Sequence, residues 1–141
     1  MGMAALYLRA HEEIAQDMGK ISNLLNSTDQ ISKQAEQIRS LLTSMTGKIK
    51  VHLAMEDDVL YPKLFQHKNA DVRATAKRFF EEMGGLKKAF SDYVGKWQGP
   101  AAIQKDPSAF MNETKAVINA LAERVKKENT ELFPMADKAL V

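Results

Sequence analysis

The sequence predicts an all-α protein, folded as an antiparallel up-down-up-down four-helix bundle. Four segments carry apolar residues at alternating steps of three and four, and no segment alternates with a period of two over a useful length. Short stretches of turn-forming residues separate these segments. The 141 residues suit a single domain, residues 1–141, because a domain of this size buries enough apolar surface to fold alone.

The first two helices are expected within the first 62 residues. A polar run at residues 26–29 ends the first helix, and Ser27 to Asp29 offer N-caps for the second. Pro62 is expected to kink or end the second helix near Tyr61. The apolar stripe of the first helix holds Tyr7, His11, Ile14, Met18, Ile21 and Leu25, and that of the second holds Ile31, Ala35, Ile38, Leu42, Met45, Ile49, His52, Glu56 and Val59.

The last two helices are expected after residue 68. Asn69 or Asp71 opens the third helix, the Gly-Pro pair at 99–100 ends it, and the Asp-Pro pair at 106–107 is typical of the start of a fourth. The Gly-Gly pair at 84–85 is expected to allow another helix to approach closely. The third stripe holds Val72, Ala76, Phe79, Met83, Leu86, Phe90, Tyr93 and Trp97, and the fourth holds Phe110, Val117, Leu121, Arg124, Glu128, Leu132 and Met135.

A shift of 72 residues relates the two halves of the chain, so each half is a helix pair. The shift superimposes residues 60–62, Leu-Tyr-Pro, on residues 132–134, Leu-Phe-Pro. Polar residues in the apolar stripes follow the same shift, and a bundle with pseudo-twofold symmetry would bring them together at one level of the core. The pairs are His11 with Met83, His52 with Arg124, and Glu56 with Glu128.

Composition excludes several classes of protein. Twenty basic and 18 acidic residues give a net charge of +2, which argues against a dedicated nucleic-acid binder. The absence of cysteine excludes disulfides, thiolate metal sites and a cysteine nucleophile. The longest apolar run, residues 3–8, is much shorter than the about 20 residues of a membrane span. No signal-peptide pattern is visible, so we expect a cytoplasmic protein without a membrane partner.

His52 and Glu56 are four residues apart and therefore point the same way from one helix. Arg124 and Glu128 repeat this geometry, and His11 lies in the stripe of the first helix. Buried carboxylates are costly unless they are paired or bind a metal, and imidazole with carboxylate is a normal ligand set for iron, manganese or zinc. A surface ion pair for Arg124 and Glu128 and a hydrogen-bonded core position for His11 are the simpler alternatives.

Three blocks of the sequence carry a resemblance to a known family. They are His11 within Arg-Ala-His-Glu-Glu, then His52-Leu-Ala-Met-Glu56 followed by Leu-Tyr-Pro, and Glu128 followed by Leu-Phe-Pro. In helix number, order and spacing the whole chain resembles the hemerythrin-like HHE cation-binding domain. The resemblance implies four helices around a carboxylate-bridged pair of metals, usually iron. It implies oxygen carriage, oxygen or redox sensing, or the handling of iron and reactive nitrogen species.

The departures from the family are confined to one half of the metal site. The resemblance places histidines where this chain has Met83 and Arg124, and often where it has Phe79. Met83 is a poor ligand for iron, and a guanidinium does not ligate at all. The other half keeps its implied ligands, His11 and His52, with Glu56 and Glu128 as bridges, and Tyr7 lies one turn before His11. For Met83 and Tyr7, packing in the core is the simpler interpretation.

We therefore expect at most one metal, iron or another divalent ion, held by His11, His52, Glu56 and Glu128. The Arg124 guanidinium is expected to take the place of the lost metal and to bind one or both carboxylates. Two carboxylates and Arg124 sum to a charge of −1, one divalent ion brings the sum to +1, and a second ion would bring it to +3. The charge count and the ligand count both disfavour a second metal.

Two classes of function follow. The first is a metal-binding domain with a reduced site that serves sensing, redox response or metal handling rather than oxygen transport. The second is a metal-free member of the fold that acts as an interaction or regulatory module, with a protein partner or a second copy of the chain. An enzyme, such as a mono-iron redox catalyst, is less favoured, because the sequence offers no nucleophile or acid–base pair outside the site. His67 is expected in an exposed loop.

Overall fold

The computed structural model describes residues 4–140, and helices are the only regular secondary structure in that range. The prediction of an all-α protein is confirmed. The helices are α1 (Ala4–Ser22), α2 (Thr28–Lys33), α3 (Ala35–Met55), η1 (Glu56–Leu60), α4 (Tyr61–Phe65), α5 (Ala70–Lys96), α6 (Pro100–Lys105), α7 (Pro107–Lys127), η2 (Glu128–Leu132) and α8 (Phe133–Ala139).

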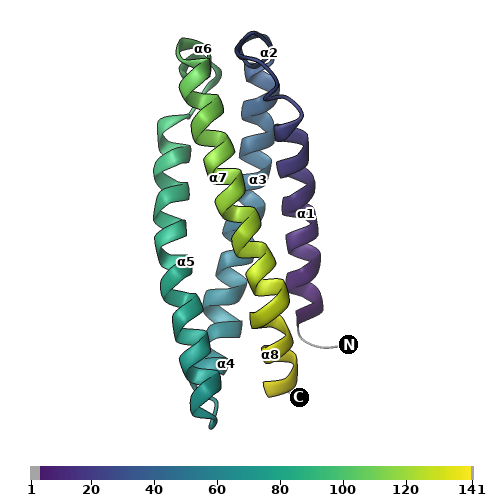
Figure 1. Cartoon of the computed structure of the whole chain (residues 1–141), viewed down its shortest axis with the longest axis vertical. Coiled ribbons are helices and arrows are strands. Elements are labelled where there is room, and N and C mark those ends of the chain that lie inside the picture. Colours follow the sequence, from purple (N-terminus) through teal and green to yellow (C-terminus); the bar gives the residue numbers. More distant parts are fainter. Residues whose placement is uncertain (1–3, 141) are drawn as a thin grey trace.

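The long helices α1, α3, α5 and α7 run alongside one another in Figure 1. The chain continues from α3 through η1 into α4, and from α7 through η2 into α8, without leaving helical geometry. Helix α1 packs against α3, α7 and α8, and α5 packs against α7, while the short helices α2 and α6 meet at one end of the molecule. None of the helices between residues 4 and 140 is both long enough and apolar enough to cross a membrane.

Three of the predicted helix starts are confirmed by their capping side chains. Ser27, Asn69 and Asp106 each accept a hydrogen bond from a backbone N–H two or three residues later, as the N-caps of α2, α5 and α7. Helix α6 was not predicted, because six residues are too few to show a helical period. It begins with Pro100, whose fixed φ suits a first turn.

Pro62 was expected to kink or end the second helix near Tyr61, and the structure interrupts the α-helix there without ending it. It continues to Phe65 through η1, a π-helical turn in which the Tyr61 N–H donates to the Glu56 carbonyl. The turn widens because Pro62 has no N–H and its ring would meet the carbonyl four residues back in a regular α-helix. Helix η2 repeats this geometry 72 residues later, before Pro134. Each π-turn thus begins at a core glutamate.

Two local expectations are wrong. A Cβ on Gly84 or Gly85 would meet no atom of another helix within 4 Å, so the Gly-Gly pair does not bring another helix close. His67 is half-buried rather than exposed. Its Nε2 lies 3.0 Å from the Ala139 carbonyl and its Nδ1 accepts from the Asn69 N–H, so it joins the α4–α5 turn to the end of α8.

The core consists of two apolar clusters with a polar layer between them. The upper cluster in Figure 1 lies toward α2 and α6 and includes Ile14, Ile49, Phe90 and Leu121. The lower cluster lies toward α4 and α8 and includes Tyr7, Leu60, Phe79 and Leu132. Four helical segments each pass from one cluster to the other. They are α1, α3 with η1 and α4, α5, and α7 with η2 and α8. Between the clusters lie the buried polar residues His11, His52, Glu56, Arg124 and Glu128.

Candidate metal centre

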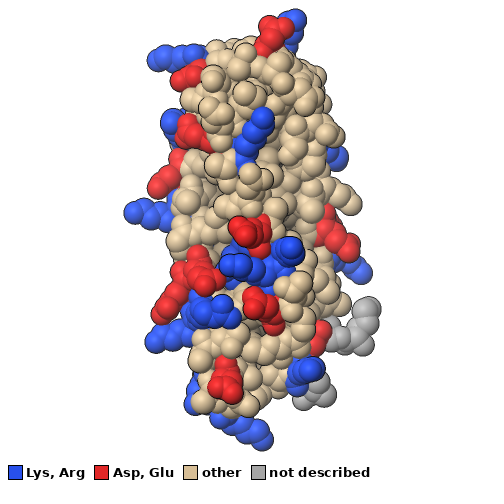
Figure 2. Space-filling view, viewed as in Figure 1, with Lys and Arg blue, Asp and Glu red and all other residues tan. Residues whose placement is uncertain are grey.

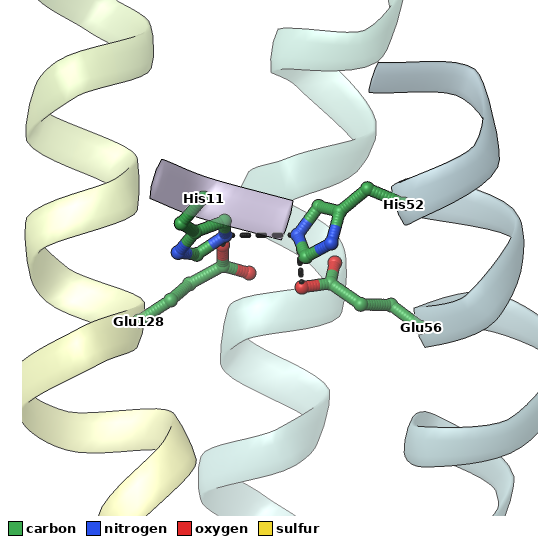
Figure 3. Close-up of side chains that lie close together, drawn as sticks. All are labelled: His11, His52, Glu56 and Glu128. Carbon is green, nitrogen blue, oxygen red and sulfur yellow. Dashed lines mark hydrogen bonds and ion pairs between the residues drawn. The ribbon is translucent and has the colours of Figure 1, made fainter. Parts of the chain in front are cut away.

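Four side chains from different parts of the chain converge in the polar layer. His11 of α1, His52 of α3, Glu56 of η1 and Glu128 of η2 each offer a ligand atom, and these atoms all lie within 4.8 Å of one another. Figure 3 shows both carboxylates and both imidazoles pointing toward a common centre. The exposed fraction of each residue is 4% or less. The structure thus brings together all four residues that the sequence predicted as ligands.

The two imidazoles form the middle of the cluster. His11 Nε2 lies 2.8 Å from His52 Nε2 and 3.2 Å from Glu128 Oε1, and His52 Nε2 lies 2.9 Å from Glu56 Oε1. Each histidine therefore presents the same ring nitrogen, Nε2, to the cluster. The two carboxylates approach from opposite sides, as their places in η1 and η2 require.

Among the four residues of the cluster, Glu56 is the one whose burial costs the most free energy. It is fully buried, and although Oε1 is near His52, the contact lacks hydrogen-bond geometry. Within residues 4–140 neither of its carboxylate oxygens has a hydrogen-bond partner, and the same is true of Glu128 Oε2. A buried acceptor without a partner costs about 1–3 kcal/mol, and more when it is charged. These oxygens are therefore positioned for a ligand that accepts their lone pairs.

The pKa values of the cluster reflect the burial of these charged groups. Burial, followed by repulsion from Glu128, raises the pKa of Glu56 to about 9. Burial and repulsion from His11 lower the pKa of His52 to about 4. Burial alone would lower the pKa of His11 too, but its hydrogen bonds with Glu128 and Asn129 raise that pKa above its usual value. In the absence of a cation, a proton on Glu56 thus relieves the repulsion between the carboxylates.

Asn129 belongs to the site and was missed by the sequence analysis. Its side-chain Oδ1 lies 2.7 Å from His11 Nδ1, so the ring donates there, and in the neutral form of His11 the lone pair is on Nε2. In a regular α-helix, neighbouring residues point about 100° apart, and the residue after a core glutamate would face away from the core. The π-turn holds more residues per turn, so this angle is smaller there and Asn129 stays closer to the core side than it would in an α-helix. The repeated Leu-aromatic-Pro motif was the only signal for the turn.

Arg124 does not bind the core carboxylates, so this prediction is wrong. Its Nη1 donates to Glu82 Oε2 at 2.5 Å, and its guanidinium carbon lies 4.3 Å from the centre of the Phe79 ring. Glu82 is 42% exposed, so the Arg124 side chain reaches toward solvent while its stem stays buried. A solvated carboxylate and an aromatic face cost Arg124 less desolvation than the centre of the core would.

The other predicted neighbours pack around the cluster. Met83 and Phe79 are buried, and Phe79 serves as the surface on which Arg124 lies. Tyr7 contacts the edge of the His52 ring at 5.9 Å between centroids and donates to the Met55 carbonyl. A cavity of about 30 Å³ adjoins the cluster; its walls include His11, His52, Glu128, Met83 and Arg124, with apolar side chains around them.

Comparison with known proteins decides the family. The family model of the hemerythrin HHE cation-binding domain matches residues 3–136, nearly the whole chain. The chain belongs to the hemerythrin HHE cation-binding domain family. No match was found among curated proteins or solved structures. The resemblance seen in the sequence is thus confirmed at the level of the family.

The hemerythrin-like cluster has the chemistry to hold a metal ion. Two imidazole nitrogens and two carboxylates make up a common donor set for iron, manganese and zinc. The unpartnered oxygens of Glu56 and Glu128 fit a cation better than any group of the protein near them. On the Met83 and Arg124 side, the described residues offer no comparable group of donors.

Proposed function

We propose that this hemerythrin-family domain binds a single divalent metal ion through His11, His52, Glu56 and Glu128, and that iron is the natural ion. The observation that carries the proposal is the buried carboxylate of Glu56, which has no hydrogen-bond partner in residues 4–140 and points into a cluster of three further donors. Such a carboxylate is costly in a metal-free core and favourable beside a cation.

We infer that the helices form an antiparallel four-helix bundle with an internal twofold repeat. The order in which each long helix meets the two apolar clusters supports this arrangement. The chain runs from the lower to the upper cluster in α1 and α5, and from the upper to the lower in α3 and α7. The two π-turns, 72 residues apart, support the repeat. Such bundles build metal sites from side chains on facing helices.

The residues of the site have separate tasks. Glu56 and Glu128 supply the negative charge that balances the ion, while His11 and His52 supply neutral nitrogen donors. Asn129 holds His11 in the tautomer whose Nε2 lone pair faces the cluster. The two apolar clusters above and below exclude water and so strengthen these interactions. A bound ferrous ion would supply a redox-active Lewis acid at this point.

A role in metal handling or in sensing a redox signal suits one metal better than oxygen transport does. Carriage of dioxygen in the hemerythrin manner takes one electron from each of two irons. Among residues 4–140, neither Met83 nor Arg124 offers a nitrogen donor for a second iron. A single redox-active ion in a buried site can respond to an oxidant or be exchanged.

Titration with Co²⁺ and Zn²⁺ tests the proposal. We expect the chain to bind one equivalent of either ion. Bound Co²⁺ should show a visible spectrum typical of nitrogen and oxygen ligands. In His52→Ala, both the binding and the spectrum should be lost. His67→Ala is the matched control, because His67 lies in the α4–α5 turn and bonds the Ala139 carbonyl instead. If the wild type binds no metal, the domain is metal-free and the alternative of an interaction module takes its place.

A further inference from the structure

Two neighbouring aromatic side chains, Phe65 of α4 and Phe80 of α5, are partly exposed at the end of the molecule where these helices meet. Their exposed fractions are 37% and 41%, and their ring centroids lie 5.5 Å apart. Both rings rest on the fully buried Tyr61, at 5.9 and 5.3 Å between centroids. One exposed apolar residue is ordinary, but two adjoining rings held by a third form a fixed apolar surface.

The two rings line a depression between α4 and α5, which we call the α4–α5 groove. Its volume is about 500 Å³, and Arg73, Lys77 and Glu81 complete its lining. Clefts that bind small molecules usually have about 300–1,000 Å³, so the groove has room for a bulky apolar side chain. A hollow with aromatic walls suits a side chain that enters it, whereas apolar side chains that bind a membrane must project into the lipid.

Basic side chains form the rim of the α4–α5 groove. Arg73, Lys77 and Phe80 lie three or four residues apart along α5, so they share one face of that helix. The Arg73 Nη1 donates to the His67 carbonyl at 2.7 Å, which holds the guanidinium beside the α4–α5 turn. The ion pairs within residues 4–140 include neither Arg73 nor Lys77, so both charges are free to bind a partner.

The positive charge of the chain is concentrated at this end. From the start of α4 to the last residue that lines the groove, residues 61–81 contain five basic and two acidic residues. This segment has a net charge of +3, although the whole chain has a net charge of only +2. Figure 2 shows Lys and Arg side chains around the lower end of the molecule, where α4 and α5 meet in Figure 1. Such a region attracts an acidic partner and orients it during its approach.

We propose that the α4–α5 groove binds an acidic segment of a partner protein, in which carboxylates flank an aromatic or leucine side chain. The apolar side chain packs against Phe65 and Phe80, and the carboxylates pair with Arg73 and Lys77. Aromatic and arginine side chains contribute most of the binding energy in many interfaces. The groove shares no residue with the metal centre, so the proposal goes beyond the proposed function and stands independently of it.

Fluorescence anisotropy with three labelled peptides of equal length, each titrated with the full chain, tests the proposal. The first peptide has a central Leu-Phe pair flanked by Asp and Glu. The second has Lys in place of the acidic residues, and the third has Ala in place of Leu and Phe. We expect saturable binding of the first peptide alone, and at least about tenfold weaker binding to the variants Lys77→Glu and Phe80→Ala.

The chain offers a matched control for each variant. Lys88→Glu is the control for charge, because Lys88 is exposed on α5 about three turns after Lys77 and does not line the groove. Val51→Ala is the control for the apolar surface, because Val51 is 62% exposed on α3. Glu81→Gln should strengthen binding, since it removes a carboxylate that repels the acidic peptide. Circular dichroism checks that each variant folds.

Equal affinity for the acidic and the basic peptide, or equal affinity of wild type and Lys77→Glu for the acidic peptide, would overturn the proposal. So would the absence of saturable binding by the acidic peptide. Sedimentation of the chain alone and binding to vesicles of phosphatidylserine and phosphatidylcholine test two other occupants. Self-association or vesicle binding that Phe80→Ala abolishes, without binding of the acidic peptide, would assign the groove to a second copy or to a membrane and would contradict the proposal.

Discussion

The two sides of the polar layer differ in how their charges are satisfied. On the His11 and His52 side, two carboxylates converge on two imidazoles, and several oxygens have no partner within residues 4–140. On the Met83 and Arg124 side, each cation already has its own carboxylate, since Arg124 binds Glu82 and Lys87 binds Asp57. The carboxylates on the His11 and His52 side lack a cation of the protein, whereas the carboxylates on the other side are paired with Arg124 and Lys87. This difference is the basis for proposing one metal site rather than two.

Removal of the Glu56 carboxylate should give the largest effect. Glu56→Gln keeps the size of the side chain but removes a charged ligand, so we expect metal affinity to fall by at least about 100-fold, more than for loss of an outer partner. The metal-free protein should become more stable, because the buried carboxylate has no hydrogen-bond partner among the described residues. Calorimetric metal titration and thermal unfolding measure the two effects.

Glu82→Gln is the matched control on the other side of the layer. Glu82 is 42% exposed and binds Arg124, so its loss should leave metal affinity unchanged and cost about 1 kcal/mol or less of stability. Equal losses of metal affinity in the two variants would show that the two sides do not differ as described.

Tight binding of a second metal on the Met83 and Arg124 side should require three substitutions. Asp57 is the repeat equivalent of Asn129, which orients His11, but Lys87 occupies the Asp57 carboxylate. We therefore expect Met83→His with Arg124→His to bind a second iron weakly, and the addition of Lys87→Ala to strengthen that binding. Metal content per chain and an oxo-to-iron absorption band measure the result. A triple variant that still binds one iron would contradict this account of the second side.

Asn129 should have a smaller, indirect effect. Asn129→Leu removes the acceptor for His11 Nδ1, so the ring can turn and change tautomer, and we expect metal affinity to fall by about 10–100-fold. Asn129→Asp should keep or increase affinity, because a carboxylate accepts from the same nitrogen more strongly. Asn119→Leu is the control, because Asn119 is exposed on α7, away from the π-turn that holds Asn129. Equal affinity of wild type and Asn129→Leu would exclude this orienting role.

A rise in pH should lower the stability of the metal-free protein through Glu56 but raise its affinity for metal. Because the pKa of Glu56 is raised to about 9 in the folded state, the metal-free protein holds a proton that the unfolded chain releases, and stability falls as pH rises toward 9. The lowered pKa of His52, about 4, acts the other way, with stability lost as pH falls below 6.5. Metal binding displaces the Glu56 proton, so affinity should rise by about tenfold per pH unit toward pH 9, and more steeply at lower pH, where His11 must also lose a proton.

Unfolding and metal titrations at several pH values measure these slopes, and Glu56→Gln provides the control. In that variant the stability of the metal-free protein should lose the part of its dependence on pH that Glu56 causes, and keep the part that the raised pKa of His11 causes. A metal affinity that is constant from pH 6.5 to 9 would contradict the assignment of Glu56 as a protonated ligand in the metal-free state.

The fold class and the four clustered donors followed from the sequence, because periodicity places His52 and Glu56 in an apolar stripe and the repeat adds Glu128. The partner of Arg124 did not follow. A long side chain chooses between carboxylates by their solvation, and that depends on tertiary structure. Asn129 was missed because a π-turn changes which residues face the core. The turn depends on how the chain accommodates Pro134, which local patterns do not specify.

Anomalous scattering from crystals of the zinc- or iron-loaded protein tests the central claim most directly. We expect one peak per chain, surrounded by His11, His52, Glu56 and Glu128, and no peak beside Met83 and Arg124. A second peak on the Arg124 side, or a bound metal elsewhere with none among the four donors, would contradict it.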